Sequence, residues 1–227
     1  MEYHVIIPAA GMGKRMGADK NKLLVEIEGA PIIIHTLSVF EQDEWCKSIT
    51  LVVNKHDQKE VNQLVSKYNL MKVANVVEGG KERQESVFKG LEQIEGESII
   101  LIHDGARPFV KQHFVHQLVE KAASKGAAIL AVPVKDTIKK VNNHLVEETI
   151  NRATLMSIQT PQAFQLSLIK EAHRQAHQDG FIGTDDASLL ERMGRKVYIV
   201  EGDYDNFKIT TPEDLHFAKA IIKKRNR

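Results

Sequence analysis

Six short apolar runs recur along the chain, with a longer segment of mixed character between each pair. They comprise residues 5–7, 49–53, 73–77, 99–102, 128–132 and 197–200. Within each run the apolar residues follow one another without alternation, which is typical of strands buried on both faces, as in a parallel sheet covered by helices. The pattern therefore predicts six buried strands.

Amphipathic segments fill the intervals between these runs. Apolar residues at helical spacing predict one helix that begins at Pro31, a second around 61–68 and a third around 87–94. A last helix is predicted to begin after Thr211, because a proline and two acidic residues make a favourable first turn. Since helices alternate with strands, we expect an α/β fold: one Rossmann-like three-layer domain over residues 1–227, with a mostly parallel sheet.

Residues 135–158 break this alternation. Two β-rich stretches, 137–141 and 145–150, flank the turn-forming residues Asn142 and Asn143. The sequence therefore predicts a protruding β-hairpin arm. Because a two-stranded hairpin is marginally stable alone in water, we expect the arm to pack on the domain or on another copy of the chain.

Composition narrows the class of protein. Hydrophobic residues make up 42% of the chain and charged residues 27%, which is ordinary for a globular protein. The formal net charge of +1 gives no basic field, so we expect no nucleic-acid partner. Cys46 is the only cysteine, which excludes an intramolecular disulfide and suits a reducing cytosol. No apolar stretch reaches the roughly 18 residues of a membrane span and no leader precedes the first strand, so we expect a cytoplasmic protein without a membrane partner.

A glycine-rich basic loop follows the first predicted strand. It covers residues 8–17, and Lys14, Arg15, Lys20 and Lys22 place four cations within nine residues. Glycine lets bare backbone N–H groups approach a phosphate, since it has no Cβ to block them. The loop therefore favours a polyphosphate ligand, against the alternative of a glycine turn with solvated charges.

Two common phosphate loops do not fit this sequence. Met16 stands where the dinucleotide-binding fingerprint has its third glycine, and Asn54 follows the second predicted strand where an acidic residue would hold a ribose. Met16 also replaces the second glycine of a Walker loop. The basic loop is therefore a nucleotide loop of another kind.

Polar residues also follow two later strands, where parallel sheets bind their ligands. Gly80 lies in a Gly-Gly turn after the third predicted strand, and the hydroxyl of Ser86 lies six residues further on, within reach of a base or sugar. Asp104 follows the fourth strand and is a natural ligand for Mg²⁺, which takes one or two carboxylates and completes its shell with phosphates and water. Arg107 can clamp a second anion through its planar guanidinium.

Other polar residues have simpler explanations. Residues 183–187 predict a helix start, with Thr184 as its cap. Lys208 falls within a late edge strand, where a surface lysine is ordinary. His173 and His177 lie four apart without the glutamate of a zinc protease, which predicts surface positions on a helix rather than a metal site.

Seven motifs lie in a fixed order along nearly the whole chain. They are P-A-A-G-x-G-x-R-M at 8–16, G-G-x-E-R at 79–83, H-D-G-A-R-P-F at 103–109, D-T-I-K at 136–139, Q-T-P-Q-A-F at 159–164, T-D-D-A at 184–187 and N-F-K-I-T-T-P-E-D-L at 206–215. With these seven motifs in this order, the chain closely resembles the 2-C-methyl-D-erythritol 4-phosphate cytidylyltransferases. These are nucleotidyltransferases of the non-mevalonate isoprenoid pathway. Two motifs depart from the family pattern: Asn21-Lys22-Leu23 stands where Pro-Lys-Gln is common, and Lys81 replaces a usual aspartate.

The resemblance implies an activity, a cofactor and a set of site residues. It implies transfer of CMP from CTP to 2-C-methyl-D-erythritol 4-phosphate with release of pyrophosphate, with Mg²⁺ as the cation, by a homodimer of single nucleotidyltransferase domains in which residues 135–158 form the dimerising arm. It implies catalytic roles for Arg15, Lys22, Arg152 and Lys208. It implies substrate contacts by Pro8, Ala9, Ala10, Gly11, Gly13, Gly80, Ser86, Asp104, Arg107, Thr137 and Thr160, with Asp104 also the metal ligand.

Two alternatives share most of these features. A ribitol 5-phosphate cytidylyltransferase would have the same loops and arm and would differ mainly in its polyol pocket. A regulatory module that binds CTP without turnover would keep the nucleotide loop, although binding alone does not require Arg15, Lys22, Asp104 and Lys208 together.

Overall fold

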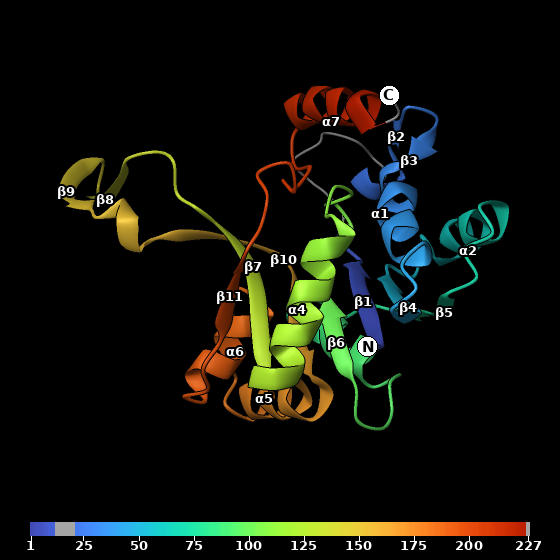
Figure 1. Cartoon of the computed structure of the whole chain (residues 1–227), viewed down its shortest axis with the longest axis horizontal. Coiled ribbons are helices and arrows are strands. Elements are labelled where there is room, and N and C mark those ends of the chain that lie inside the picture. The colour runs from blue at the N-terminus through green and yellow to red at the C-terminus, as the bar shows by residue number, and fades with distance from the viewer. Residues whose placement is uncertain (12–20, 226–227) are drawn as a thin grey trace.

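A seven-stranded sheet forms the centre of the computed structural model, which describes residues 1–11 and 21–225 (Figure 1). Its strands are β1 (Tyr3–Ala9), β4 (Cys46–Val53), β5 (Val73–Glu78), β6 (Ile99–Ile102), β7 (Ala127–Pro133), β10 (Met156–Gln165) and β11 (Tyr198–Glu201). They lie in the order β11-β7-β10-β6-β1-β4-β5. Two small hairpins stand apart from this sheet, one of β2 (Glu26–Ile27) and β3 (Ala30–Pro31), the other of β8 (Ile138–Asn142) and β9 (Leu145–Ile150).

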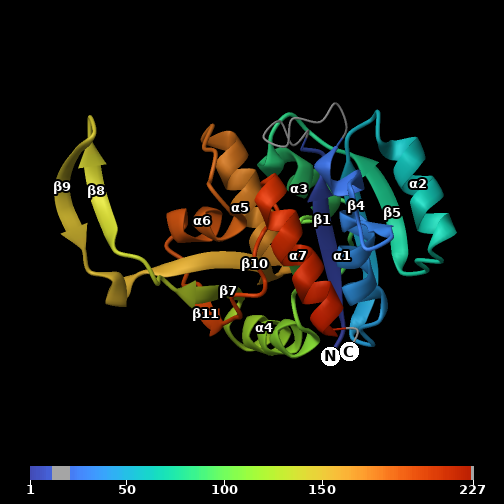
Figure 2. The same ribbon diagram turned by 90° about the horizontal axis from the view of Figure 1, so that it is seen from above.

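Helices cover both faces of the sheet. They are α1 (Ile32–Glu41), α2 (Gln58–Lys67), α3 (Arg83–Leu91), α4 (Gln112–Lys125), α5 (Leu166–Gln178), α6 (Asp186–Arg192) and α7 (Pro212–Arg225), with short 3₁₀ turns η2 (Lys22–Leu24) and η3 (Arg152–Thr154). Figure 2 shows α3, α5 and α6 on one face and α1, α4 and α7 on the other. Within the described ranges, no helix has both the length and the apolar character that a membrane crossing requires.

Two hydrophobic cores result from this layering. Along β1, Ile6 packs with α3, α5 and α6, whereas Val5 and Ile7 face the core formed with α1, α4 and α7. All three side chains are fully buried. The apolar runs of β1, β4, β6 and β7 therefore have the predicted cause, and the α/β three-layer fold is confirmed. The prediction of burial is wrong for β5 and β11, because they are the two edge strands of the sheet and are only partly buried.

The sheet contains one strand that the apolar pattern does not predict. β10 runs antiparallel to both of its neighbours, β6 and β7, while the other strand pairs of the sheet are parallel. Gln159, Pro161 and Gln162 interrupt the apolar character of this segment, although residues 159–164 are buried. Its side-chain amides bond to protein groups, since Gln162 donates to Asp185 at 2.7 Å and Gln159 donates to the Asp203 carbonyl at 2.9 Å.

Lys208 does not lie in an edge strand, so that prediction is wrong. The edge strand is β11, which ends at Glu201, and the chain then turns across the carboxyl end of the sheet. There the backbone N–H of Ile209 donates to the carbonyl of Ala106 at 2.9 Å instead of to a neighbouring strand. This crossing carries Lys208 from the rim of the sheet to its centre.

The β8–β9 arm projects away from the sheet (Figure 1). Asn143 and His144 join its strands with φ of 46° and 66°, and positive φ at both turn residues matches the twist of a two-residue hairpin. Ile138, Val141, Leu145 and Val146 expose between 36% and 65% of their surface. The predicted hairpin is present, but its turn lies one residue later than predicted, because Asn142 ends β8 and pairs with Leu145. The apolar side chains of the arm are open to solvent in the single chain.

Gly90 sets the closest approach of α3 to the sheet. A Cβ at this position would lie 2.6 Å from Cγ2 of Ile6 and 3.1 Å from Cγ2 of Val52. We expect Gly90→Ala to lower the free energy of unfolding in a urea titration, because overpacking costs about 1–3 kcal/mol and alanine regains at most about 1 kcal/mol as a better helix former. Ser66→Ala on the exposed face of α2 is the control and should stay within about 0.5 kcal/mol of the parent. A more stable Gly90→Ala variant would contradict the close packing.

Candidate active site

A pocket opens beyond the carboxyl ends of β1 and β6. The chain proceeds from β1 to β4 and β5 on one side and returns to β6 on the other, so the strand order reverses beside β1. Such reversal points are where open α/β sheets bind ligands. The pocket holds about 330 Å³ and is lined by Pro8, Ala9, Ala10, Gly11, Lys22, Leu23, Gly80, Lys81, Glu82, Arg83, Ser86, Asp104, Gly105, Ala106, Lys208 and Thr210.

One wall consists of the backbone of residues 8–11, at the end of β1, and of the Gly-Gly turn that contains Gly80, after β5. A Cβ on Gly79 would lie 2.5 Å from Cβ of Ala10, so the turn after β5 packs directly on the end of β1. The hydroxyl of Ser86 accepts the N–H of Gly80 at 3.0 Å and donates to the Glu82 carbonyl at 3.1 Å. Ser86 therefore fixes the Gly-Gly turn from the first turns of α3 and reaches the pocket at the same time.

Lys22 enters the pocket from the turn η2. Asn21 caps this turn, since its side chain accepts the N–H of Leu23 at 3.1 Å and donates to the Ala9 carbonyl at 3.0 Å and to Asp57 at 2.8 Å. Lys22 Nζ donates to the Ile209 carbonyl at 2.9 Å. Asn21 thus joins the lysine turn to the end of β1.

Asp104 gathers three cations at the end of β6. Its carboxylate lies 2.9 Å from Lys208 Nζ, 3.5 Å from Arg107 Nε and 3.6 Å from Arg83 Nε. Burial disfavours ionisation, but the charges of Lys208, Arg83 and Arg107 outweigh it and hold the pKa of Asp104 well below its ordinary value. The pocket therefore carries an ionised carboxylate surrounded by an excess of positive charge.

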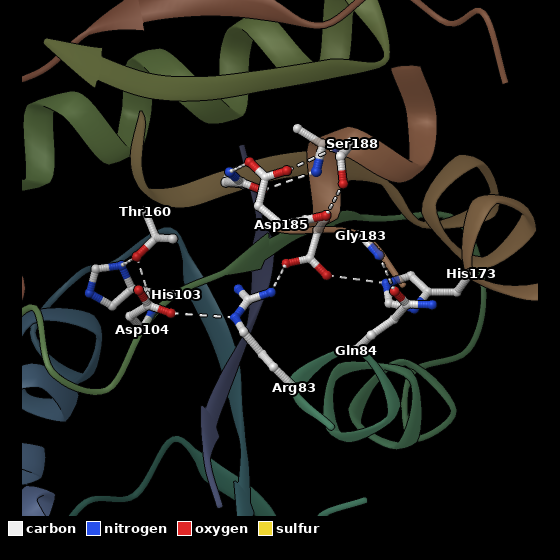
Figure 3. Close-up of polar contacts among 12 residues, drawn as sticks. Arg83, Gln84, His103, Asp104, Thr160, His173, Gly183, Asp185 and Ser188 are labelled. Carbon is white, nitrogen blue, oxygen red and sulfur yellow. Dashed lines mark hydrogen bonds and ion pairs between the residues drawn. The ribbon is translucent and has the colours of Figure 1, made fainter. Parts of the chain in front are cut away.

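His103 and Thr160 hold Asp104 from behind (Figure 3). Burial lowers the pKa of His103 to about 4, so its ring is neutral at neutral pH. Nε2 lies 2.9 Å from the Arg107 carbonyl and therefore donates to it, while Nδ1 lies 3.2 Å from the Thr160 hydroxyl and accepts from it. The hydroxyl oxygen in turn accepts the N–H of Asp104 at 2.9 Å. Thr160 thus acts on the pocket through Asp104.

Arg107, Thr137 and Arg152 do not line this pocket. Arg107 is mostly buried and donates to the Asn206 carbonyl at 2.8 Å, so it braces Asp104 from the side. Thr137 and Arg152 are exposed near the base of the arm, where Arg152 donates to the Lys135 carbonyl. Gly13 and Arg15 lie outside the described residues.

Two predictions about α5 and α6 are wrong. Thr184 is not the cap of α6, because the side chain of Asp185 accepts the N–H of Ser188 at 3.0 Å. His173 is not a surface residue, because it is only 2% exposed and lies 3.2 Å from Asp186. The four-residue spacing predicted a helix but did not show which of its faces is buried.

Arg83 is a pocket residue that was not predicted from the sequence. Its guanidinium contacts Asp104 at 3.6 Å and Asp186 at 2.7 Å, and its side chain lines the pocket. A signal was present in the sequence, since Arg83 ends the G-G-x-E-R motif and begins the helix that follows a strand end.

The donor set at Asp104 suits Mg²⁺ bound chiefly by substrate. Residues 1–11 and 21–225 contain no cluster of three or more His, Cys, Asp or Glu side chains that could hold a metal alone. Mg²⁺ commonly takes one or two carboxylates and completes its shell with phosphate oxygens and water. A single ionised carboxylate at the pocket floor fits that pattern.

Comparison with known proteins places these features in a family. The sequence signature of the family described as 2-C-methyl-D-erythritol 4-phosphate cytidylyltransferase matches residues 3–224. The chain is 54% identical to the enzyme of that name from Halalkalibacterium halodurans over 227 residues, the full length of both. It is 56% identical to the enzyme of that name from Geobacillus kaustophilus over 225 residues, which cover 99% of each chain.

Solved structures give the same result. The 4-diphosphocytidyl-2C-methyl-D-erythritol synthase of Anaerococcus prevotii matches with a TM-score of 0.86 and 33% identity over 98% of both chains. The 2-C-methyl-D-erythritol 4-phosphate cytidylyltransferase of Thermus thermophilus matches with a TM-score of 0.82 and 32% identity over 98% of this chain and 100% of the other. With signature, relatives and architecture in agreement, the chain belongs to the 2-C-methyl-D-erythritol 4-phosphate cytidylyltransferase family.

Proposed function

We propose that the pocket beyond β1 and β6 is where this cytidylyltransferase moves CMP from CTP to 2-C-methyl-D-erythritol 4-phosphate. The observation that carries the proposal is the convergence of Lys22, Asp104 and Lys208 on one pocket, although they are far apart in the sequence. Its backbone wall suits a nucleotide, and its cations suit a triphosphate beside a second phosphate.

The chemistry needs positioning and charge neutralisation more than proton transfer. A phosphate oxygen of the sugar alcohol attacks the α-phosphorus of CTP, a new P–O bond forms, and the bond to the β-phosphate breaks to release pyrophosphate. A phosphate monoester has a second pKa of about 6, so its attacking oxygen is largely ionised at neutral pH without a protein base. The protein must therefore bring two anions together and stabilise the charge that moves to the leaving group.

CTP would occupy the side of the pocket formed by the glycine turns. Backbone at residues 8–11 and at Gly80, with Ser86, would hold the cytidine and the first phosphates. Lys22 would stabilise charge on the triphosphate, and we assign the same role to Arg15 and a backbone contact to Gly13. Lys81 lies at the rim, where it presents a cation instead of the family's usual aspartate.

The sugar phosphate would occupy the side formed by Asp104 and Lys208. Lys208 would draw the phosphate toward the α-phosphorus, and Arg107 and Thr160 would keep Asp104 in place. Arg152 and Thr137 are exposed at the base of the arm, so we assign them to the corresponding site of a second copy. Mg²⁺ would be held by Asp104 together with the phosphates, and when bound it would neutralise charge on the phosphate oxygens.

Pyrophosphate release from purified protein with CTP and Mg²⁺ tests this function. We expect strong preference for 2-C-methyl-D-erythritol 4-phosphate over ribitol 5-phosphate offered in parallel. Preference for ribitol 5-phosphate would keep the mechanism and change the acceptor. Release with neither acceptor, together with CTP binding in a titration, would favour the regulatory module.

We also propose that the enzyme works as a cytoplasmic homodimer. A single cysteine suits a reducing compartment. The exposed apolar residues of the arm favour an interface with a second copy, because an isolated hairpin has no core of its own.

The assembly can be tested by sedimentation. We expect the parent to sediment as a dimer and the doubly substituted Leu145→Asp, Val146→Asp variant to sediment as a monomer, because two charges would have to be buried against the partner. Glu148→Gln, also exposed on β9, is the matched control and should remain dimeric. A parent that is fully active as a monomer would contradict the assignment of Arg152 and Thr137.

A further inference from the structure

Arg83 lies between two carboxylates of different exposure. Its Nε lies 3.6 Å from Asp104, at the floor of the pocket, and its Nη1 donates to Asp186 at 2.7 Å. In Figure 3 its side chain extends from α3 to Asp104. The Arg83 side chain is 32% exposed, whereas that of Asp186 is 1% exposed. The guanidinium therefore has one end anchored inside the protein and the other end at the reaction site.

The anchor itself is firmly placed. Asp186 is the first residue of α6, and the start of that helix is joined to β10 by Gln162, which donates to Asp185 at 2.7 Å and accepts the N–H of Ala187 at 3.2 Å. Burial disfavours the charge on Asp186, but the Arg83 guanidinium and the hydrogen bond from His173 keep its pKa below its ordinary value. An ionised carboxylate, held at the start of α6, thus faces Arg83 from behind.

His173 completes the anchor from α5. Its Nε2 lies 3.2 Å from the second oxygen of Asp186, and its ring stacks on Phe88 of α3 at 5.9 Å between centroids. Its Nδ1 is buried and has no hydrogen-bond partner within residues 1–11 and 21–225. A proton on Nδ1 would leave a buried donor unsatisfied, so the geometry suits the neutral ring with its hydrogen on Nε2. In that form His173 donates to Asp186 and leaves the other oxygen to Arg83.

We propose that Asp186 and His173 are positioning residues that hold Arg83 against Asp104 for the transfer reaction. The inference rests on the proposed function of the pocket. The proposed contacts run from His173 on α5 to Asp186 on α6, and from Arg83 on α3 to Asp104 at the end of β6. None of the catalytic or substrate-contact assignments above includes Arg83, Asp186 or His173.

Stability alone does not explain this arrangement. A buried ion pair is often no more stabilising than apolar residues of similar volume. Arg83 would also have no need to extend to Asp104 if its purpose were only to neutralise Asp186. Without Asp186 the guanidinium could turn toward the phosphates, and Asp104 would lose the partner of one oxygen.

A double-mutant cycle tests whether Asp186 acts through Arg83. We expect Asp186→Asn to lower kcat by about 10- to 100-fold, the usual scale for the outer partner of a site residue, with each KM within about threefold of the parent because the charges that draw substrate remain. In an Arg83→Met background the same substitution should lower kcat no further, since its only route to the pocket is gone. A full additional loss in that background would overturn the proposal.

Substitutions of His173 provide a test that does not depend on the Asp186 variant. His173→Gln keeps an N–H donor near the position of Nε2, whereas His173→Leu removes it. We expect His173→Leu to lower kcat by about tenfold and His173→Gln to restore most of that loss. Equal kcat values for the two variants would overturn the role of His173.

Asp43 offers a matched control at the opposite end of the sheet. It is a buried carboxylate that also pairs with a histidine, His116, at 2.9 Å, and it accepts the hydroxyl of Tyr3 at 2.6 Å. Asp43→Asn should lower the melting temperature and leave kcat unchanged at temperatures where circular dichroism shows the protein folded. An equal loss of kcat there would mean that kcat follows stability, which would overturn the proposal. A parent without pyrophosphate release would instead refute the proposed function.

Discussion

Replacing Lys22 by alanine is expected to lower kcat by about 10²- to 10³-fold, the scale on which one preorganised charge partner contributes to a transition state. Lys22 is held in advance, since Asn21 fixes its turn to the end of β1 and its ammonium group already donates to the Ile209 carbonyl. The charge therefore needs no reorganisation when negative charge moves to the leaving pyrophosphate. Steady-state rates of pyrophosphate release at saturating CTP measure the effect.

The control for Lys22→Ala removes a lysine where no substrate is expected. Lys47 lies near the amino end of β4 and pairs with Glu2 at 3.3 Å, with both side chains more than half exposed. Lys47→Ala should leave kcat within about twofold of the parent, because an exposed ion pair contributes little. A Lys22→Ala variant with kcat within threefold of the parent would remove Lys22 from the catalytic group.

Asp104→Asn is expected to lower kcat by about 10²-fold while the KM for CTP stays the same or falls. The asparagine keeps the size of the side chain, but Lys208, Arg83 and Arg107 lose the charge that orients them. The three cations would then bind anions without the carboxylate that opposes them. CTP binding therefore persists, since the phosphates would supply most ligands of Mg²⁺, and the loss falls on the reacting geometry, because the oriented cations and the carboxylate that would hold Mg²⁺ are both disturbed. Full kinetics with each substrate varied in turn separate the two effects.

A carboxylate on the surface provides the comparison for Asp104. Asp179 pairs with Arg192 at 3.1 Å across the ends of α5 and α6 and does not line the pocket. Asp179→Asn should leave both kcat and KM near the parent values. If Asp104→Asn raised the KM for CTP strongly and left kcat unchanged, Asp104 would be a binding group and not an organiser of the cations.

The fold could largely be predicted from local patterns, with one informative exception. Strands such as β1 and β6 are continuous apolar runs, and burial on both faces leaves that signature in the sequence. β10 was not predicted, because its buried positions include Gln159 and Gln162, whose amides have hydrogen-bond partners only in the folded chain. A buried polar residue with satisfied hydrogen bonds resembles a loop residue in the sequence.

The candidate site divides in a similar way. Three pocket residues could be predicted because they come after strands whose carboxyl ends meet at one edge of a parallel sheet. They are Lys22, Gly80 and Asp104. Arg83 and Asp186 are 103 residues apart and join elements on the same face of the sheet, a contact that no local spacing encodes. Lys208 was misplaced because its segment owes its position to a bond with Ala106, which lies far from it in the chain.

The place of β10 in the sheet also constrains how the chain can be built. β10 lies between β6 and β7, although both precede it in the chain, so a ribosome delivers β6, α4 and β7 before the strand that separates them. At about 5–20 residues per second, the emerging chain spends seconds with a vacant central position in its sheet. A direct β6–β7 pairing formed in that interval would have to be undone. The arm joins β7 to β10, and Met156 pairs directly with Pro133, so β10 can add to β7 as a hairpin once it emerges and the pair can then close on β6.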